Sequence, residues 1–312
     1  MADKIATREA YGKALAEFSS KYDIVVMDAD LAAATKTGIF KKACPERFID
    51  CGIAEQNMMS VAAGIAACGK TVFASSFAMF AAGRAFEQVR NSICYPNLNV
   101  KIGATHGGIS VGEDGATHQC LEDIGIMRTI PNMVVINPAD AVEARAAVEA
   151  AILHNGPVYL RFCRLATSVL YNEANFKFEI GKGISLKDGK DVTIIANGVM
   201  VEMALEAADA LAKENISARV IDMHTVKPID REIVLKAAKE TGAIVTAEEH
   251  NIYGGLGSAV AEVVCEEMPV PVLRVGTKDV FGKSGKPAEL FERYGLTAAN
   301  IAENAKKAIA LK

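Results

Sequence analysis

Two histidines and two carboxylates lie close together in a glycine-rich stretch, residues 105–118. These side chains are His106, Glu113, Asp114 and His118, with four glycines among them. The stretch follows an apolar run typical of a strand, and ligands of open parallel sheets bind beyond the carboxyl ends of strands. We therefore expect a ligand site here. A solvated surface loop is the simpler alternative, and a zinc site is disfavoured because the histidine spacing matches no zinc signature.

A single glutamate, Glu55, lies at the expected start of a helix rich in small residues. A carboxylate in a first helical turn is commonly there because the helix dipole stabilises it, and this explanation requires no function. The alternative is a buried carboxylate that holds and moves a proton in a dry pocket. Glu55 is therefore the second candidate for chemistry.

Two phenylalanines, Phe77 and Phe80, are three residues apart at the entry to another expected helix, so their rings share one face. Packing in the core is the usual role of such a pair. A flat apolar wall for a heteroaromatic ring is the functional alternative. The same helix continues through Arg84, Glu87 and Arg90, for which we predict a solvated or salt-bridged face.

The composition is that of an ordinary globular protein of 312 residues, with 51% hydrophobic residues and a formal net charge of −4. No bulk positive field would attract nucleic acid or an anionic membrane, so we predict neither as a partner. The seven cysteines are odd in number and include no C-x-x-C pair, which indicates reduced thiols. Because the chain shows no apolar signal region and no apolar stretch of about 20 residues, we expect a cytoplasmic protein.

Short β-branched apolar runs alternate with alanine-rich segments of helical period, which is typical of parallel strands joined by helices. The predicted fold class is therefore α/β, with two doubly wound domains. Strands are predicted at residues 24–30, 71–76, 99–105, 133–138, 157–163, 192–197, 219–222, 243–247 and 270–275. Helices are predicted near residues 7–18, 54–68, 79–94, 139–153, 201–213, 231–241, 258–267 and 298–311. Because the periodicity is lost in between, we place a first domain at 1–168, a linker at 169–190 and a smaller domain at 191–312.

The second domain contains Glu248, Glu249 and His250, followed by the glycine-rich turn 254–258. The turn is similar to a dinucleotide-binding fingerprint, but Val260 stands where the third glycine is required. A tight strand-to-helix turn is the better interpretation, and a nucleotide-binding protein of the Rossmann type is disfavoured. The sequence also lacks a P-loop, a nucleophile elbow and an EF-hand pattern.

Four motifs together resemble the transketolase family, from about residue 7 to the final helix. They are Gly-Ile-Ala-Glu-Gln at 52–56 and Gly-Glu-Asp-Gly-Ala-Thr-His-Gln at 112–119, with weaker support from 248–250 and 254–258. The resemblance implies a pyrimidine-binding domain at residues 1–168, a transketolase C-terminal domain at 191–312, and thiamine diphosphate as the cofactor.

The family's diphosphate-binding domain, with its G-D-G motif for Mg²⁺ and pyrophosphate, has no counterpart in this sequence. No glycine-rich turn offers the carboxylate and amide ligands that Mg²⁺ needs, so no metal-binding residue is predicted here. The resemblance therefore implies a split enzyme, in which a separate N-terminal subunit supplies the metal and the diphosphate contacts. It also implies two copies of each chain, a heterotetramer.

By the same resemblance, Glu55 is the catalytic glutamate that hydrogen-bonds and activates the cofactor's aminopyrimidine, and His118 is a second catalytic residue. Phe77 and Phe80 match aromatic residues of the pyrimidine pocket. The residues that match substrate-binding positions are Arg8, His106, Asp114, His118 and Arg164. Guanidinium groups suit a sugar phosphate because their planar forks bind phosphate oxygens in pairs.

Two departures from the family pattern change the expected pocket. Gly83 stands where many full-length relatives carry a further aromatic residue, so other residues would build part of the pyrimidine wall. The family's phosphate-binding serine has no clear match, and we expect Thr35 or Thr37 to replace it.

The expected activity is that of a transketolase, a transferase of carbohydrate metabolism in the pentose phosphate pathway. A two-carbon ketol unit would move from a ketose phosphate to an aldose phosphate. One alternative is a related thiamine enzyme, similar to 1-deoxyxylulose-5-phosphate synthase or to the beta subunit of a 2-oxo acid dehydrogenase. Another is a non-catalytic regulatory or assembly paralogue. His106 and the Gly-Glu-Asp-Gly-x-Thr-His motif favour ketol transfer over decarboxylation.

Overall fold

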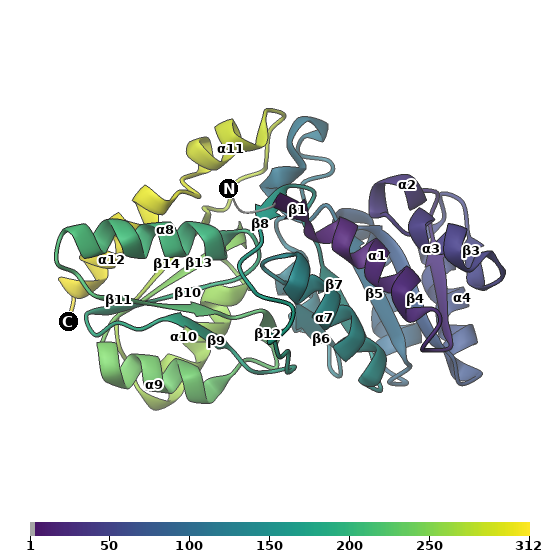
Figure 1. The fold of residues 1–312 in the computed structure, drawn as a ribbon, viewed down its shortest axis with the longest axis horizontal. Coiled ribbons are helices and arrows are strands. Elements are labelled where there is room, and N and C mark those ends of the chain that lie inside the picture. Colours follow the sequence, from purple (N-terminus) through teal and green to yellow (C-terminus); the bar gives the residue numbers. More distant parts are fainter. Residues whose placement is uncertain (1–3) are drawn as a thin grey trace.

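The computed structural model of the protein describes residues 4–312, and Figure 1 shows two α/β units side by side. One unit is built on a seven-stranded sheet and the other on a five-stranded sheet. Near the N-terminus, β1 (Lys4–Ala6) and β8 (Ala166–Ser168) form a small antiparallel pair. The α/β fold class predicted from the sequence is confirmed. Within residues 4–312, no helix has the length and apolar character needed to cross a membrane.

The first sheet has the strand order β12-β6-β7-β5-β4-β2-β3. Its strands are β2 (Ile24–Asp28), β3 (Phe48–Asp50), β4 (Thr71–Phe77), β5 (Val100–Thr105), β6 (Val134–Ile136), β7 (Val158–Arg161) and β12 (Thr225–Lys227). All neighbours are parallel except β12 and β6. Every residue of β5 is buried, as expected of a parallel strand covered on both faces. The five strands predicted for this domain form the middle of the sheet.

Helices cover both faces of the first sheet. On one face, α1 (Thr7–Phe18) packs against α7 (Ala141–Leu153) around buried residues such as Tyr11. On the other face, α4 (Glu55–Ala67) contributes Met58 to a separate cluster. The remaining helical segments of this unit are α2 (Ala32–Thr35), α3 (Gly38–Ala43), η1 (Pro45–Arg47), η2 (Met79–Arg84), α5 (Phe86–Gln88), η3 (Val89–Cys94), η4 (Ile109–Asp114) and α6 (Asp123–Arg128).

The helix predicted at residues 79–94 contains two π-helical turns, η2 and η3. Ala85 N donates to Phe80 O, and Tyr95 N donates to Arg90 O, so each donor lies five residues after its acceptor. Such widened turns inside helices are frequent at functional sites. The first of them directly follows β4 and carries Phe80.

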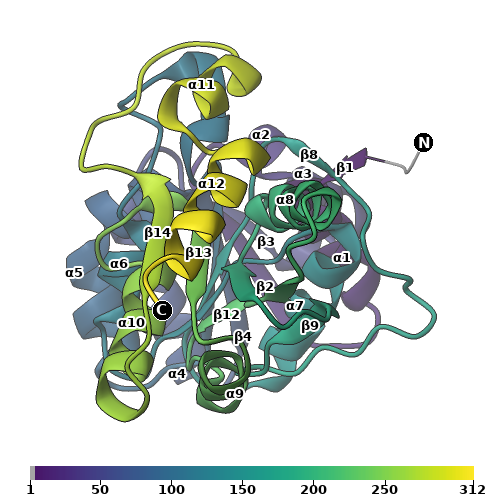
Figure 2. The same ribbon diagram turned by 90° about the vertical axis from the view of Figure 1, so that its left-hand side faces the viewer.

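The second sheet has the order β14-β13-β10-β11-β9. Its strands are β9 (Ile184–Lys187), β10 (Val192–Ala196), β11 (Ala218–Asp222), β13 (Ile244–Asn251) and β14 (Val272–Thr277). Its helices are α8 (Met200–Lys213), α9 (Arg231–Thr241), α10 (Leu256–Glu267), α11 (Pro287–Tyr294) and α12 (Ala298–Ile309). Figures 1 and 2 show α8 and α12 on one face of this sheet and α9 and α10 on the other. Strand β9 lies within the predicted linker 169–190, and the domain boundaries stay a prediction.

Main-chain hydrogen bonds tie the two units together. Strand β12 comes from the second half of the chain, yet Thr225 pairs with Ile136 of β6 in the first sheet. Next to this pair, Asn137 N donates to His224 O at 2.8 Å, and Gly198 N donates to Asn137 O at 3.2 Å. The second unit therefore has a fixed place against the first.

A cluster of fully buried carboxyl groups lies at this junction. Asp140 and Glu143 at the start of α7 lie close to Asp222 at the end of β11. Asp140 accepts from the backbone N–H groups of Glu143, Leu170 and Tyr171. Glu143 Oε1 and Asp222 Oδ1 are buried without a hydrogen-bond partner among the described residues. Burial raises the pKa of Glu143 well above its ordinary value and that of Asp222 to about 7.

We predict that Glu143→Gln removes most of this pair's effect on the pH dependence of stability. The folded chain keeps a proton that the unfolded chain has released above pH 4.5. Unfolding therefore releases a proton, and stability falls as the pH rises from 4.5 towards the raised pKa of Glu143. A glutamine at this position has no carboxyl proton to release, so this contribution to the pH dependence is lost. Relative to the variant, the wild type should lose about 1 kcal/mol per pH unit in this window.

Urea unfolding at a fixed protein concentration, repeated across this pH window, measures the difference. The control is Glu206→Gln, because Glu206 is exposed on α8, and this change should leave the pH slope as in the wild type. If the curves of the wild type and of Glu143→Gln run parallel, the Glu143 carboxyl does not keep its proton in the folded chain.

Candidate active site

Glu55 is buried at the start of α4, with 2% of its surface exposed. The chain enters the helix through Gly52, whose φ of 66° suits a residue without Cβ. The Oε2 atom of Glu55 accepts a hydrogen bond of 3.2 Å from Nη1 of Arg84. Glu55 is therefore not a solvent-exposed carboxylate of a first helical turn. It is buried, and its charge is paired with that of Arg84.

Arg84 joins Glu55 to the predicted aromatic pair. Its guanidinium carbon lies 4.8 Å from the centroid of the Phe80 ring, within cation–π distance. The Arg84 side chain is 51% exposed, so it lies between the buried carboxylate and solvent. From the sequence we predicted only a solvated or salt-bridged face for Arg84 and missed its partner. The four-residue spacing between Phe80 and Arg84 could have indicated the contact of Arg84 with the Phe80 ring, since such residues share a helix face.

Phe77 and Phe80 form an aromatic cluster with both histidines of the glycine-rich stretch. The Phe77 ring stacks on His106, with centroids 3.8 Å apart, and on Phe80 at 5.8 Å. His118 meets the Phe80 ring edge-on at 5.4 Å. Core packing alone does not describe the pair, because Phe80 is only partly buried and lines a cavity.

His106 directly follows β5 in a left-handed backbone conformation, with a φ of 58° that is uncommon outside glycine. Its Nε2 lies 3.0 Å from Arg8 Nη1, and because a guanidinium can only donate, Nε2 is the acceptor. The other ring nitrogen, Nδ1, then donates to the Thr105 hydroxyl at 2.9 Å. Burial, and then the charges of Arg8 and Arg164, lower the pKa of His106 to about 3. His106 is therefore a neutral hydrogen-bonding group with a fixed tautomer.

Arg8 and Arg164 lie at the same end of the site. Arg8, in the first turn of α1, also donates to Ala34 O at 2.9 Å, and burial followed by the charge of Arg164 lowers its pKa. Arg164 donates to Val111 O and lies 3.8 Å from Asp114. The two neighbouring guanidinium groups are a local source of positive charge that suits an anionic ligand, and Glu113 and Asp114, 3.5 and 3.8 Å from Arg164 Nη1, offset part of it.

The predicted residues form two neighbouring groups. The carboxylate and aromatic group contains Glu55, Phe77 and Phe80, linked through Arg84. The polar group contains Arg8, His106, Asp114 and Arg164. The stack of Phe77 on His106 and the edge contacts of His118 with both phenylalanines join the two groups. The structure thus places all the predicted residues in one region, and their roles stay predictions.

Thr35 and Thr37 do not have the role that we expected from the sequence. Both hydroxyls donate to the same carboxylate oxygen of Asp28, at 2.7 and 2.8 Å, and both side chains are fully buried. A hydroxyl has a single proton to donate, so neither group is available as a donor to a phosphate. The expectation that one of them replaces a phosphate-binding serine is therefore wrong.

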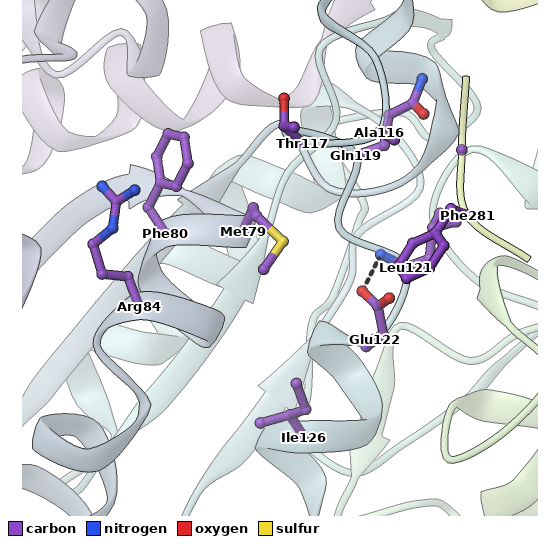
Figure 3. A pocket seen from close by; sticks show the side chains of 11 residues that line it. Met79, Phe80, Arg84, Ala116, Thr117, Gln119, Leu121, Glu122, Ile126 and Phe281 are labelled. Atoms are coloured by element: carbon purple, nitrogen blue, oxygen red, sulfur yellow. Dashed lines mark hydrogen bonds between the residues drawn. The ribbon is translucent and has the colours of Figure 1, made fainter. Parts of the chain in front are cut away.

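A cavity of about 550 Å³ opens beside the aromatic group. Figure 3 shows Phe80 and Arg84 together on one side of it, and Phe281, from the segment between β14 and α11, on the opposite side. Its size is typical of small-molecule sites. Phe80 and Arg84 line the cavity, and Glu55 does not line it but accepts from Arg84. A buried carboxylate near a flat aromatic wall fits a heteroaromatic ring that carries a hydrogen-bonding nitrogen. Within residues 4–312, no three His, Cys, Asp or Glu side chains are grouped so that they could hold a metal ion.

Comparisons with known families match both parts of the chain. The model of the transketolase pyrimidine-binding domain matches residues 3–168, and that of the transketolase C-terminal domain matches residues 181–301. A 6-deoxy-6-sulfo-D-fructose transketolase subunit from Clostridium sp. is 47% identical over 94% of this chain and 91% of its own length. Human transketolase is 42% identical over 96% of this chain, but the match covers only 48% of the human protein.

Solved structures give the same picture. A split-gene transketolase, described as an inactive β4 tetramer, superposes with a TM-score of 0.93 at 57% identity and covers 99% of both chains. Transketolase from Leishmania mexicana superposes with a TM-score of 0.82 at 25% identity, over 99% of this chain and 46% of its own. Both parts of this chain therefore have counterparts in larger and in split proteins.

We predict that Glu55 and Arg84 are energetically coupled. Arg84→Met leaves a buried carboxylate without its cation and should lower the free energy of unfolding by about 1 to 2 kcal/mol, less than for a fully buried pair because Arg84 is half exposed. In a Glu55→Gln background the same change should cost about 1 kcal/mol less, since no charge is left unpaired. Urea unfolding of both single variants and the double variant measures the coupling. Strictly additive effects would mean that the observed contact contributes nothing.

Proposed function

The chain belongs to the transketolase family, and we propose that it is the C-terminal subunit of a split, thiamine diphosphate-dependent transketolase. It would transfer a two-carbon ketol unit from a ketose phosphate to an aldose phosphate, and only together with a separate N-terminal subunit. The observation that carries the proposal is the buried Glu55 carboxylate, which Arg84 joins to Phe80 at the wall of an open cavity.

The need for a partner is inferred from the relatives. Human transketolase is about twice as long as the segment it shares with this chain. Relatives of nearly the same length as this chain are named as subunits. One of them, an apulose-4-phosphate transketolase subunit from Phocaeicola vulgatus, is 41% identical over 96% of both chains. We infer that a second chain supplies Mg²⁺ and the diphosphate contacts, and that two copies of each chain form a heterotetramer.

The residues of the first group fit the aminopyrimidine part of the cofactor. Thiamine diphosphate, when bound, supplies the nucleophilic carbon that receives the two-carbon unit. The Glu55 carboxylate would hydrogen-bond a ring nitrogen and hold a proton there, in surroundings that exclude water. Phe77 and Phe80 would provide the flat apolar surface. Arg84 is exposed enough to move aside when the ring takes its place at Glu55.

The residues of the second group would hold the sugar. Arg8 and Arg164 supply bidentate donors for a phosphate. The neutral His106 would bind a sugar hydroxyl at Nε2 in exchange for its hydrogen bond from Arg8, without taking up a proton. His118 is partly buried at the edge of both phenylalanine rings, so it lies between the two groups. We assign to it the exchange of a proton with the substrate.

The substrates and the cellular setting are further parts of the proposal. Two relatives are named for sulfofructose and for apulose phosphate, and the paired guanidinium groups favour an anionic sugar in this chain as well. We place the reaction in the pentose phosphate pathway. All seven cysteines are unpaired, which supports a reducing cytoplasm as its location.

We predict that neither this chain nor its N-terminal partner is active alone, and that the mixture is active. The assay contains both chains, thiamine diphosphate and Mg²⁺, and measures ketol transfer from a ketose phosphate to an aldose phosphate. Pyruvate is offered in a parallel assay as the substrate expected of the related thiamine enzymes. Turnover by this chain alone would exclude the split enzyme, and turnover of pyruvate in place of the ketose would exclude a transketolase.

We predict that Glu55→Gln lowers kcat of the mixture by about 10² to 10⁴, because an amide cannot hold and release the proton. The matched control is Glu87→Gln, an exposed residue three positions after Arg84, which should retain wild-type kcat. Measurement of kcat with both chains and cofactor in excess tests this. Unchanged activity of Glu55→Gln would point to a non-catalytic assembly partner.

A further inference from the structure

The second unit contacts the glycine-rich stretch of the first at its most buried point. Glu249, near the end of β13, accepts a hydrogen bond at Oε1 from the backbone N–H of Ser110 in η4. Glu249 is 1% exposed, and its other oxygen, Oε2, has no partner within the described residues. Burial raises the pKa of Glu249 to about 7, which reflects the cost of removing a carboxylate from water. The Glu249 carboxylate, whose burial costs free energy, thus lies against the glycine-rich stretch of the first unit.

The backbone of the loop is shaped to admit this carboxylate. Gly108 has a φ of 87°, and a Cβ built there would lie 2.3 Å from Cδ of Glu249. Only glycine fits such a contact. Gly112 also has a positive φ, of 81°, and a Cβ there would come within 3.2 Å of Pro287 at the start of α11. The loop therefore packs closely on the second unit at two separate points.

Further contacts hold the C-terminal end of the loop and the strand β7 beside it. Gln119 Nε2 donates to Lys283 O at 2.9 Å, and Asn251 N donates to Leu121 O at 2.8 Å. Arg161 of β7 donates from Nη2 to Glu249 O at 2.9 Å. Every one of these contacts joins residues of the first sheet and its loops to the second unit. Asp114 and His118 lie between the points of contact.

We propose that the second domain is a clamp for the substrate-binding loop at residues 107–119, and that Glu249 is the positioning residue of this clamp. The inference rests on the proposed function, because it gives the loop its substrate role. Glu249 itself touches neither substrate nor cofactor. It acts by fixing the Ser110 backbone, and so the places of Asp114 and His118 relative to His106.

The neighbouring Glu248 provides a matched comparison. It is equally buried on the same strand, but its two oxygens accept from Leu256 N and Gly257 N at 2.7 and 2.8 Å. Glu248 therefore caps α10 inside the second unit. The two adjacent buried carboxylates thus bind different segments. Glu248 binds the start of α10 in its own unit, and Glu249 binds the loop of the first unit.

Hydrogen exchange of the full chain, followed by mass spectrometry, tests the clamp without any partner subunit. Glu249→Ala should raise the exchange rates of amides in 107–119 about tenfold, as expected when a buried hydrogen bond is lost. Glu249→Gln keeps an acceptor and should stay close to the wild type. Glu248→Ala should leave the loop unchanged and raise exchange at the start of α10. If Glu249→Ala does not fold, Glu249→Asp replaces it, since its shorter side chain cannot reach Ser110.

Kinetics of the reconstituted enzyme supply a second readout. Glu249→Ala should raise KM for the ketose about tenfold or more, because the loop residues are misplaced, while Glu249→Gln restores it. The affinity for thiamine diphosphate, measured by calorimetry, should not change. Loop exchange equal to the wild type in Glu249→Ala, or a rise spread evenly over the chain, would overturn the clamp. An inactive wild-type mixture would instead count against the proposed function. The hydrogen-exchange experiment does not depend on enzyme activity, so it tests the clamp separately.

Discussion

The parallel register of β4 and β5 is the constraint on which the site depends. Phe77, the last residue of β4, is the direct partner of Thr105, the last residue of β5. Because parallel strands end at the same edge of a sheet, the next residues of both strands meet there, and His106 stacks on Phe77. A slip of one residue would turn Phe77 to the opposite face of the sheet and dismantle the cluster.

The local charges of Arg8 and Arg164 favour binding of an anion at the site, although the chain as a whole is acidic. The net charge of −4 is spread over the surface, whereas Arg8 and Arg164 are held near each other by backbone acceptors. Their positive field, added to burial, keeps His106 neutral. At the other end of the site, the buried Glu55 carboxylate is paired with the partly exposed Arg84. The arginine end thus suits an anionic group, and the carboxylate end suits a group that donates a hydrogen bond.

The junction between the units is part of the site's architecture. Strand β12 completes the first sheet with residues from the second half of the chain, and the carboxyl cluster beside it is closed to water. The loop with the predicted substrate residues begins at the end of β5, and Glu249 near the end of β13 contacts it at Ser110. A first unit without the second would have neither its edge strand nor this support.

The sequence by itself determined the α/β class, the five central strands of the first sheet and the residues Glu55, Phe77, Phe80, His106 and His118 as neighbours at one site. The class and the strands follow from a hydrophobic period that is local in the sequence, whereas the grouping of these five residues was implied by the resemblance to the transketolase family. Only the tertiary structure determined the hydrogen-bond partners of these and neighbouring side chains. Arg84 donates to Glu55, Thr35 and Thr37 donate to Asp28, and Glu249 accepts from Ser110 N. Such hydrogen bonds depend on distances between segments far apart in the chain, and no local period encodes those distances.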